Sequence, residues 1–328
     1  MPRRRSLLAL GTAASAASLA SFPMARAQSG WPDRPVRFIV PFPGGSSPDL
    51  TGRLVAQHLA DVLGQPVVVE NKAGAGGNIG TDTVAKATDG LTLGLSINGP
   101  LSTAPALYRG LPYDPQKDLA MISLLVRGGQ VLAVNRDLPV TDFAGFVAHA
   151  RANPGKLTFG SVGAGSGGHL AMEDIKGRLG LTLEHVPYRG FPPAVLDLTA
   201  GRISAMVVTA AAILPQLREG TGRALAVTTE ARMPQLPEVP TLVELGLDGA
   251  VSYGWQVMIA PTGTPAERVA LLAREARRAL STERARQVME AAAFEVVAGT
   301  PEEAAAYVAA EAARWGGLIR DLGLSLEG

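Results

Sequence analysis

The stretch VRFIVPFPGGSSPDLTGR, residues 36–53, constrains the fold more than any other part of the chain. Val36, Phe38, Ile39 and Val40 form a run of β-branched and aromatic side chains, which predicts a strand buried on both faces of a parallel sheet. Two prolines then end the strand, two glycines allow a turn, and Ser46, Ser47 and Asp49 favour a helix start. Such a turn presents unpaired N–H groups and suits a carboxylate or phosphate, although an ordinary strand-to-helix turn explains the same residues.

The same pattern of strand, small-residue loop and helix recurs along the chain. This alternation predicts an α/β architecture with a ligand crevice at the carboxyl ends of parallel strands. Two α/β lobes joined by crossing segments account for the length better than one continuous sheet. Residues 265–280 and 301–322 predict two long amphipathic helices that begin at proline. Further apolar runs lie at 67–69, 92–97, 121–126, 130–135, 157–162, 184–190, 205–208 and 224–227.

Residues 1–27 predict a secretory signal peptide. Three arginines precede an apolar, small-residue run at 7–22, and residues 25–27 offer a cleavage site before Gln28. Residues 4–8 also approximate a twin-arginine signal. We therefore expect export to the periplasm by the Sec or the twin-arginine route, and not a transmembrane anchor, because no stop-transfer cluster follows the run.

Composition excludes several function classes for the exported form. The predicted leader holds four arginines and no acidic residue, so its removal takes the formal charge from +1 to −3. A weakly acidic chain lacks the basic surface that nucleic acid or anionic lipid requires. The chain has no cysteine, which excludes disulfides, thiolate chemistry and Fe–S clusters. Its four histidines fall in no metal spacing, so we expect neither a metal nor a cofactor.

Eight ordered blocks across the chain resemble the extracytoplasmic solute receptors of tripartite tricarboxylate transporters, the Bug or TctC family. The resemblance covers nearly all of the chain after the leader. The blocks are PFPGGSSPD (41–49), ENKAGAGGNIGTDTVAKA (70–87), LYRGLPYD (107–114), FGSVGAGSGGHLA (159–171), HVPYRGFPPA (185–194), ALAVTTEAR (224–232), PEVPTLVELG (237–246) and APTGTP (260–265).

The resemblance implies a two-lobed, type II "Venus flytrap" periplasmic binding protein, each lobe a mostly parallel sheet flanked by helices. Lobe 1 is then expected to comprise residues 28–127 and 232–328, and lobe 2 residues 128–231. Such a protein catalyses no reaction, works as a monomer, holds a small organic carboxylate between its lobes and delivers it to the membrane permease subunits of the transporter.

The resemblance also implies a set of ligand-binding residues at the strand ends. Which of these residues contact the ligand and which only shape the cleft is left open. Asp49 could instead cap its helix, and the Arg189 side chain could instead point to solvent. From lobe 1 the set comprises Phe42, Gly45, Ser46, Asp49, Gly76 and Asn98. From lobe 2 it comprises Ser161, Gly163, Ser166, His169, Tyr188, Arg189, Gly190 and Thr209.

Two departures from the family pattern bear on the ligand. Ser46 and Pro48 replace a glycine and a threonine that are frequent in the first loop, so backbone donors are expected to be placed differently there. Val208 stands where many members carry an acidic residue, so an α-amino group has no obvious partner. This favours a plain mono- or dicarboxylate over an amino acid.

Three other functions compete with this interpretation. Residues 163–168 fit a G-x-G-x-x-G dinucleotide pattern, and Glu184 follows at about the expected distance. The same loop is a degenerate nucleophile elbow around Ser166, but no histidine follows His185 in the chain. An exported enzyme would use Ser166, His169 or Glu184. A ligand-sensing receptor would use the same cleft as a transport receptor.

Overall fold

The computed structural model describes residues 30–326. The predicted signal peptide, residues 1–27, therefore lies outside the described residues. Among the described helices, none combines the length and the apolar character that a membrane span needs.

The first lobe is built on a sheet that begins with the predicted parallel strands. β1 pairs in parallel with both β2 and β3, and β9 then adds to β3 in antiparallel orientation. The strands predicted at 36–40 and 92–97 are confirmed. The strands of this lobe are β1 (Val36–Val40), β2 (Val67–Asn71), β3 (Thr92–Ile97), β9 (Tyr253–Pro261), β10 (Phe294–Val296) and the first part of β4 (Leu119–Asn135).

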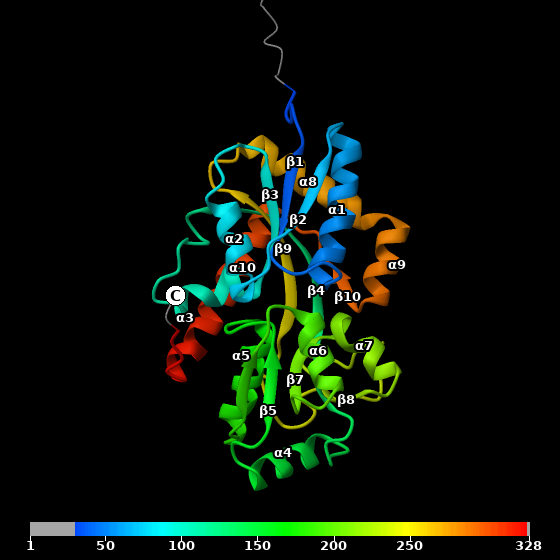
Figure 1. The fold of residues 1–328 in the computed structure, drawn as a ribbon. Helices are drawn as coiled ribbons and strands as arrows, with labels where there is room; N and C mark the ends of the chain where they lie inside the picture. The colour runs from blue at the N-terminus through cyan, green and yellow to red at the C-terminus, as the bar shows by residue number, and fades with distance from the viewer. Residues whose placement is uncertain (1–29, 327–328) are drawn as a thin grey trace, which may run out of the picture.

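Helices cover both faces of the first-lobe sheet (Figure 1). Side chains alternate along β1, so Phe38 and Val40 share a core with α1 and α8, whereas Ile39 belongs to a core with α2 and α10. The helical segments are α1 (Ser47–Leu63), the 3-10 turn η1 (Ala75–Gly77), α2 (Asn78–Ala85), the π-type turn η2 (Gly99–Thr103), α3 (Ala104–Leu107), α8 (Ala266–Ser281), α9 (Glu283–Ala291) and α10 (Pro301–Asp321).

The second lobe repeats this plan. β5 pairs in parallel with β6 and β7, and the last part of β4 pairs with β7 and β8 in antiparallel orientation. Phe146 of α4 and Ile175 of α5 pack with Phe159 of β5 in a separate core. The remaining elements are α4 (Phe143–Ala152), β5 (Thr158–Ser161), α5 (Gly167–Leu179), β6 (Glu184–Pro187), α6 (Phe191–Thr199), β7 (Ala205–Thr209), α7 (Ala210–Arg218) and β8 (Gly222–Val227).

The long strand β4 links the two lobes. It pairs with β9 as far as Gly129 and with β7 from Gln130 onward, so one strand belongs to both sheets. The sequence shows this strand as two apolar runs, and the structure joins them. The predicted change of lobe between residues 127 and 128 stays a prediction, and it falls close to this change of partner.

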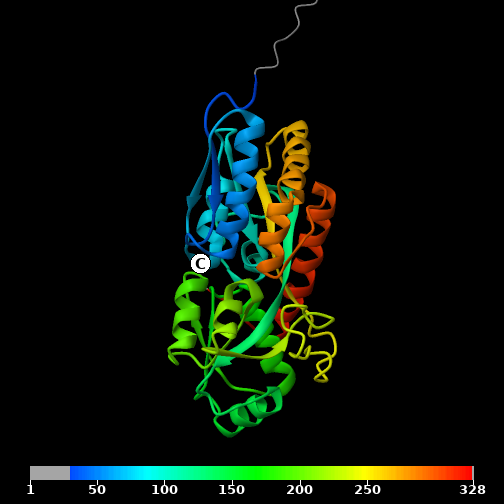
Figure 2. The ribbon, with the colours of Figure 1, turned by 90° about the vertical axis from the view of Figure 1, so that its right-hand side faces the viewer.

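The second predicted boundary, at residue 232, also stays a prediction, and part of the segment that follows it packs against the second lobe. Leu242, Leu247 and Ala250 lie in the core that contains Phe146 and Phe159. In Figure 2 the yellow-green segment that precedes β9 lies beside the lower lobe. The packing therefore favours a boundary nearer to Ser252, because the chain returns to the first-lobe sheet only with β9.

Candidate ligand-binding site

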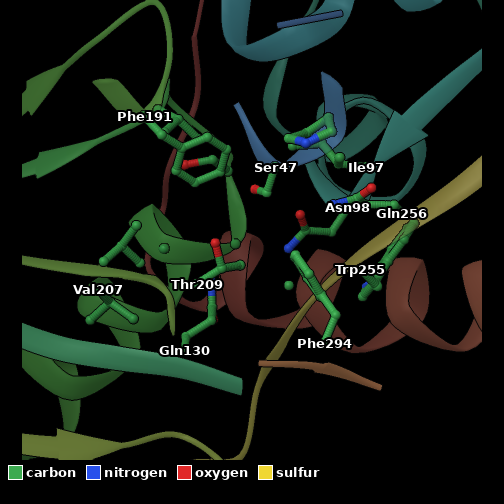
Figure 3. A pocket seen from close by; sticks show the side chains of 17 residues that line it. Ser47, Ile97, Asn98, Gln130, Phe191, Val207, Thr209, Trp255, Gln256 and Phe294 are labelled. Carbon is green, nitrogen blue, oxygen red and sulfur yellow. The ribbon is translucent and has the colours of Figure 1, made fainter. Parts of the chain in front are cut away.

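A pocket lies between the lobes, where strand ends and helix starts from both meet (Figure 3). We call it the inner pocket. It contains about 450 Å³ of free space, including space open to solvent. None of its lining residues carries an ionisable side chain. They are Ser47, Pro48, Ile97, Asn98, Gln130, Val162, Ser166, Gly167, Gly168, Phe191, Val207, Val208, Thr209, Gly254, Trp255, Gln256 and Phe294.

Four helices begin at the inner pocket, and three of them start there with a small residue. α1 starts with Ser47, α5 with Gly167, and α7 directly after Thr209, and all three positions line the pocket. The first N–H groups of a helix have no partner within the helix and lie at the positive end of its dipole. Because α1 belongs to the first lobe and α5 and α7 to the second, an anion in the pocket can accept hydrogen bonds from both lobes.

Buried polar atoms without partners concentrate in this pocket. Among the described residues, five buried side-chain nitrogen or oxygen atoms have no hydrogen-bond partner, and three of the five belong to the lining. They are Ser166 Oγ, Thr209 Oγ1 and Gln256 Oε1. Since buried polar groups are nearly always hydrogen-bonded, these atoms indicate that a polar ligand or water completes the site.

The rest of the inner pocket is apolar. Phe191, Trp255, Phe294 and Val208 supply much of the wall. Val208 is only 2% exposed, and no carboxylate side chain lines the pocket beside it. A ligand ammonium group would therefore find no anionic partner in this wall, in keeping with the expectation from the sequence.

The predicted ligand-binding residues fall into two groups. Asn98, Ser166 and Thr209 line the inner pocket. The other members of the predicted set lie behind or beside it. They are Phe42, Gly45, Ser46, Asp49, Gly76, Ser161, Gly163, His169, Tyr188, Arg189 and Gly190.

Asp49 holds the first loop through its carboxylate. Oδ2 accepts hydrogen bonds from Gly45 N at 3.0 Å and from Arg53 Nε at 2.9 Å, and Oδ1 accepts one from Asn71 Nδ2 at 2.9 Å. Burial opposes ionisation, but the hydrogen bonds from Arg53, Gly45 and Asn71 outweigh it and lower the pKa of Asp49. In this loop Ser46 Oγ is also engaged, because it donates to the Pro43 carbonyl at 2.7 Å.

Two stacked histidines hold the loop between β5 and α5. The rings of His169 and His185 lie 4.0 Å apart between centroids. His169 Nδ1 accepts a hydrogen bond from Gly165 N at 3.1 Å, and His185 Nε2 lies 2.7 Å from Ser161 Oγ. The Ser161 hydroxyl also accepts from Gly163 N at 3.1 Å and lies 2.9 Å from the Gly163 carbonyl. All these contacts are satisfied when His185 Nε2 carries a proton and Ser161 donates to that carbonyl.

Burial keeps both imidazoles neutral. It lowers the pKa of His169 to about 3, with further effects from His185 and Lys176. Burial also lowers the pKa of His185 to about 4, again with an effect from Lys176. Glu173 lies 3.8 Å from His169 Nε2 and would favour a charged ring, but Lys176 Nζ pairs with this carboxylate at 2.7 Å. We therefore treat both rings as neutral acceptors and donors within the loop scaffold.

Glycines bring the lobes into contact beside the pocket. A Cβ atom on Gly163, whose φ is +128°, would lie 2.6 Å from Gly76 Cα in the other lobe. A Cβ atom on Gly190 would lie 2.8 Å from Pro43 Cδ, again across the lobes. Both distances are too short for a side chain, so these glycines serve close approach of the two backbones.

Neither Tyr188 nor Arg189 belongs to the lining of the inner pocket. The Tyr188 hydroxyl donates to Asp197 Oδ2 at 2.7 Å, and Asp197 also accepts from Arg202 Nε at 2.7 Å. Arg189 is exposed.

Sequence reasoning missed a wall of the pocket that comes from antiparallel strands. Gln130 lies where β4 changes partner, Trp255 and Gln256 belong to β9, and Phe294 begins β10. A signal was present for two of them, because Gln130 and Gln256 are isolated amides within long apolar runs. The Gln130 amide is fixed by Ser252, which donates to its Oε1 at 2.8 Å.

The enzyme alternatives lack the expected geometry. Glu184 pairs with Thr158 at the start of β5, whereas the glycine-rich loop follows Ser161 at its end, so the acid lies at the wrong edge for a ribose. Ser166 Oγ has no hydrogen-bond partner, and the nearest histidine, His169, is engaged by Gly165 N. Within residues 30–326, no group of three potential metal ligands is found.

Two α/β lobes that share crossing strands and enclose a pocket between helix starts define a periplasmic binding protein. The family model described as "Tripartite tricarboxylate transporter family receptor" matches residues 51–324. The chain belongs to this family. It is similar to the protein BugT of Bordetella pertussis, with 38% identity over 299 residues that cover 90% of this chain and 92% of BugT.

Two solved structures of similar proteins contain a bound dicarboxylate. R. palustris Rpa4515 with adipate superposes with a TM-score of 0.86 and 35% identity over 90% of this chain and all of that chain. MatC (Rpa3494) from Rhodopseudomonas palustris with bound malate superposes with a TM-score of 0.84 and 31% identity over 88% of this chain and all of that chain.

Proposed function

We propose that this protein captures a small organic carboxylate in the inner pocket and delivers it to the membrane subunits of a tripartite tricarboxylate-type transporter. The observation that carries the proposal is the pocket itself. Four helix N-termini from two lobes meet there with the unpartnered atoms Ser166 Oγ, Thr209 Oγ1 and Gln256 Oε1. The adipate and malate bound by two structural relatives support the same ligand class.

The site favours an anion that carries no cationic group. Without an arginine or lysine in the lining, N–H groups and neutral side chains must stabilise the negative charge, as helix N-termini do for many anions. The absence of a lining acid gives an ammonium group no counterpart. A mono- or dicarboxylate therefore fits better than an amino acid.

We assign ligand contact to the lining group of the predicted residues and support to the rest. Asn98, Ser166 and Thr209 contact the ligand, together with Ser47 and Gln256. The remaining predicted residues place these groups or bring the lobes together. The protein works in the periplasm, as a monomer without cofactor, and catalyses no reaction of its own.

Closure of the lobes explains how binding is reported to the permease. The contact between Gly76 and Gly163 forms only when the lobes are together, and the ligand lies beside this contact. A ligand that bridges both lobes binds the closed state more tightly and shifts the population toward it. The permease subunits then recognise the closed form.

A ligand panel tests the proposal directly. We expect at least one mono-, di- or tricarboxylate or aromatic acid to bind with a Kd in the micromolar range or below in isothermal titration calorimetry, and to raise Tm through binding to the native state. The matched amino acids, such as aspartate beside succinate, should bind at least about tenfold more weakly, which is about 1.4 kcal/mol.

Two outcomes would overturn the assignment. A panel in which no carboxylate binds would remove the carboxylate site. Conversion of any bound panel member to a product, followed by NMR over hours of incubation, would replace the binding protein with an enzyme.

A further inference from the structure

A second hollow adjoins the inner pocket and shares two of its residues. We call it the outer groove. Ser47 and Phe191 line both spaces, so the groove and the inner pocket are adjacent. It contains about 1000 Å³ of free space, including space open to solvent. Its place beside the candidate ligand makes it a candidate part of the same site.

The outer groove is formed by one face from each of three helices that begin at the pocket. α6 contributes Phe191, Val195 and Leu196, which follow helical spacing along one face. α7 contributes Ala212 and Pro215 in the same way. α1 adds its first turn from the opposite lobe. Because the two spaces share Ser47 and Phe191, a chain that leaves the inner pocket past these two residues would enter the groove.

The wall of the outer groove is uncharged and mostly apolar, and its polar members are Ser46, Ser47, Thr199 and Gln216. None of its fourteen lining residues has an ionisable side chain. Leu196 is 62% exposed and Leu50 is 38% exposed, and both lie in this wall. Large exposed apolar side chains that gather in one hollow typically mark a binding surface. A charged ligand end has no partner in this wall, whereas a hydrocarbon chain would cover it.

We propose that the outer groove binds an apolar chain of the ligand whose carboxylate lies in the inner pocket. Phe191 stands at the junction, where its ring packs 5.9 Å from that of Phe42 between centroids. The ligand class is then a carboxylate with an extended hydrocarbon substituent, and not only a compact acid. This inference rests on the proposed function, because the carboxylate anchors the ligand at the helix N-termini.

A homologous series of straight-chain acids tests the groove. Butanoate, hexanoate, octanoate and decanoate carry the same carboxylate and differ only in chain length. We expect the affinity measured by isothermal titration calorimetry to rise about two- to fourfold per methylene once the chain passes Phe191, as expected for burial of CH₂ groups. The heat capacity change on binding should become more negative along the series.

A substitution at the surface tests the outer groove independently of the inner pocket. Leu196→Asp places a charge in the groove on an exposed position of α6, so the fold should be retained. We expect octanoate to bind at least about tenfold more weakly to this variant, whereas butanoate should bind within about twofold of its original affinity. Val62→Asp is the matched control, because Val62 is 46% exposed on α1 and lies outside the groove. It should leave the whole series unchanged.

The outcomes distinguish failure of the outer-groove proposal from failure of the carboxylate site in the inner pocket. Affinity that stays flat or falls beyond butanoate, or a Leu196→Asp variant that binds octanoate normally, would overturn the groove and leave the carboxylate site in place. If no acid in the series or in the wider panel binds, the proposed function fails, and the groove assignment fails with it.

Discussion

The two loops that carry the helix starts toward the pocket are built alike and held differently. In the first lobe, Ser46 precedes α1, and in the second lobe Ser166 precedes α5, both with extended backbone and no side-chain cap. The first loop is held by the Asp49 carboxylate, whose side chain is only 6% exposed and is paired with the 55% exposed side chain of Arg53. The second is held by the buried, neutral pair His169 and His185.

This difference indicates which loop should respond more strongly to a change of pH or to side-chain substitution. Ions near the surface keep their charge across the neutral pH range and are screened by salt. Buried imidazoles must stay uncharged for the second loop to keep its shape. The second loop is also the one whose serine hydroxyl is left free for the ligand. A lower pH and side-chain substitutions should therefore affect the second loop more than the first.

The largest expected effect is acid destabilisation through the histidine pair. Both rings have a folded-state pKa well below 6.5, at about 3 and about 4, so the unfolded chain binds more protons as the pH falls below 6.5. Their stabilisation is complete above that pH and is lost progressively toward their folded-state pKa values. At about pH 5 we expect a loss of about 3 kcal/mol in the free energy of unfolding, allowing for the partial exposure of His185.

Urea unfolding as a function of pH measures this loss. The variants His169→Asn and His185→Gln keep a polar atom near the one that the loop uses, and each should flatten the profile between about pH 6.5 and about pH 4.5. An unchanged profile in the double variant would show that the histidines do not set the acid response.

The next effect concerns contact between the lobes. Gly163→Ala adds a Cβ only 2.6 Å from Gly76 Cα, so the closed state must open slightly. We expect carboxylate affinity to fall about thirtyfold, or about 2 kcal/mol. Gly45→Ala is the matched change in the first loop, since its φ is also positive but no atom lies within 4 Å of the added Cβ. Both variants lose stability through backbone strain, and only the first should lose affinity in calorimetry for a short acid such as butanoate, which does not extend into the outer groove that Gly45 lines. Equal affinities would contradict the closure argument.

A smaller effect is expected when Ser166 or Ser46 is replaced by alanine. Ser166→Ala removes a hydroxyl that has no protein partner, so we expect about tenfold weaker ligand binding with little change in stability. Ser46→Ala removes the hydrogen bond to the Pro43 carbonyl, so we expect about 1 kcal/mol of destabilisation and affinity within about twofold. Parallel calorimetry and urea titrations measure both. The reverse pattern would place the ligand at the first loop.

The smallest effect is that of Arg53→Met. The ion pair with Asp49 is largely exposed on the arginine side, so its removal should cost less than about 0.5 kcal/mol. The difference in urea midpoint should disappear in high salt because exposed charges are screened. A loss above about 2 kcal/mol would mean that the first loop depends on its ion pair as strongly as the second depends on its histidines.

The parallel strands and most helices could be predicted from the sequence because each is a local pattern. The apolar runs at 36–40 and 92–97 became β1 and β3, and the amphipathic stretches near the carboxyl end became α8 and α10. β9 was not predicted, because an antiparallel strand that returns from the other lobe falls outside the repeated order of strand, loop and helix along the chain. β4 was predicted as two runs, since the polar residues at its centre mark the change of lobe.

The pocket residues also divide into those that could be predicted from the sequence and those that could not. Asn98 directly follows β3, Thr209 ends β7, and Ser166 lies in the short loop after β5, so their place at the pocket could be inferred from chain order. Gln256 and Phe294 reach the pocket only because β9 and β10 pair with β3 and β4, which no local pattern reveals. The sequence also could not show that the Asp49 carboxylate is already engaged by its neighbours.

A crystal structure of the protein with the tightest-binding carboxylate of the panel tests the central claim most directly. We expect one carboxylate group of the ligand to lie in the inner pocket, within hydrogen-bond distance of Ser166 Oγ and of N–H groups in the first turn of α5. Residues of the first lobe should contact the same ligand. A carboxylate bound outside this pocket, or held by one lobe alone in a closed molecule, would contradict it.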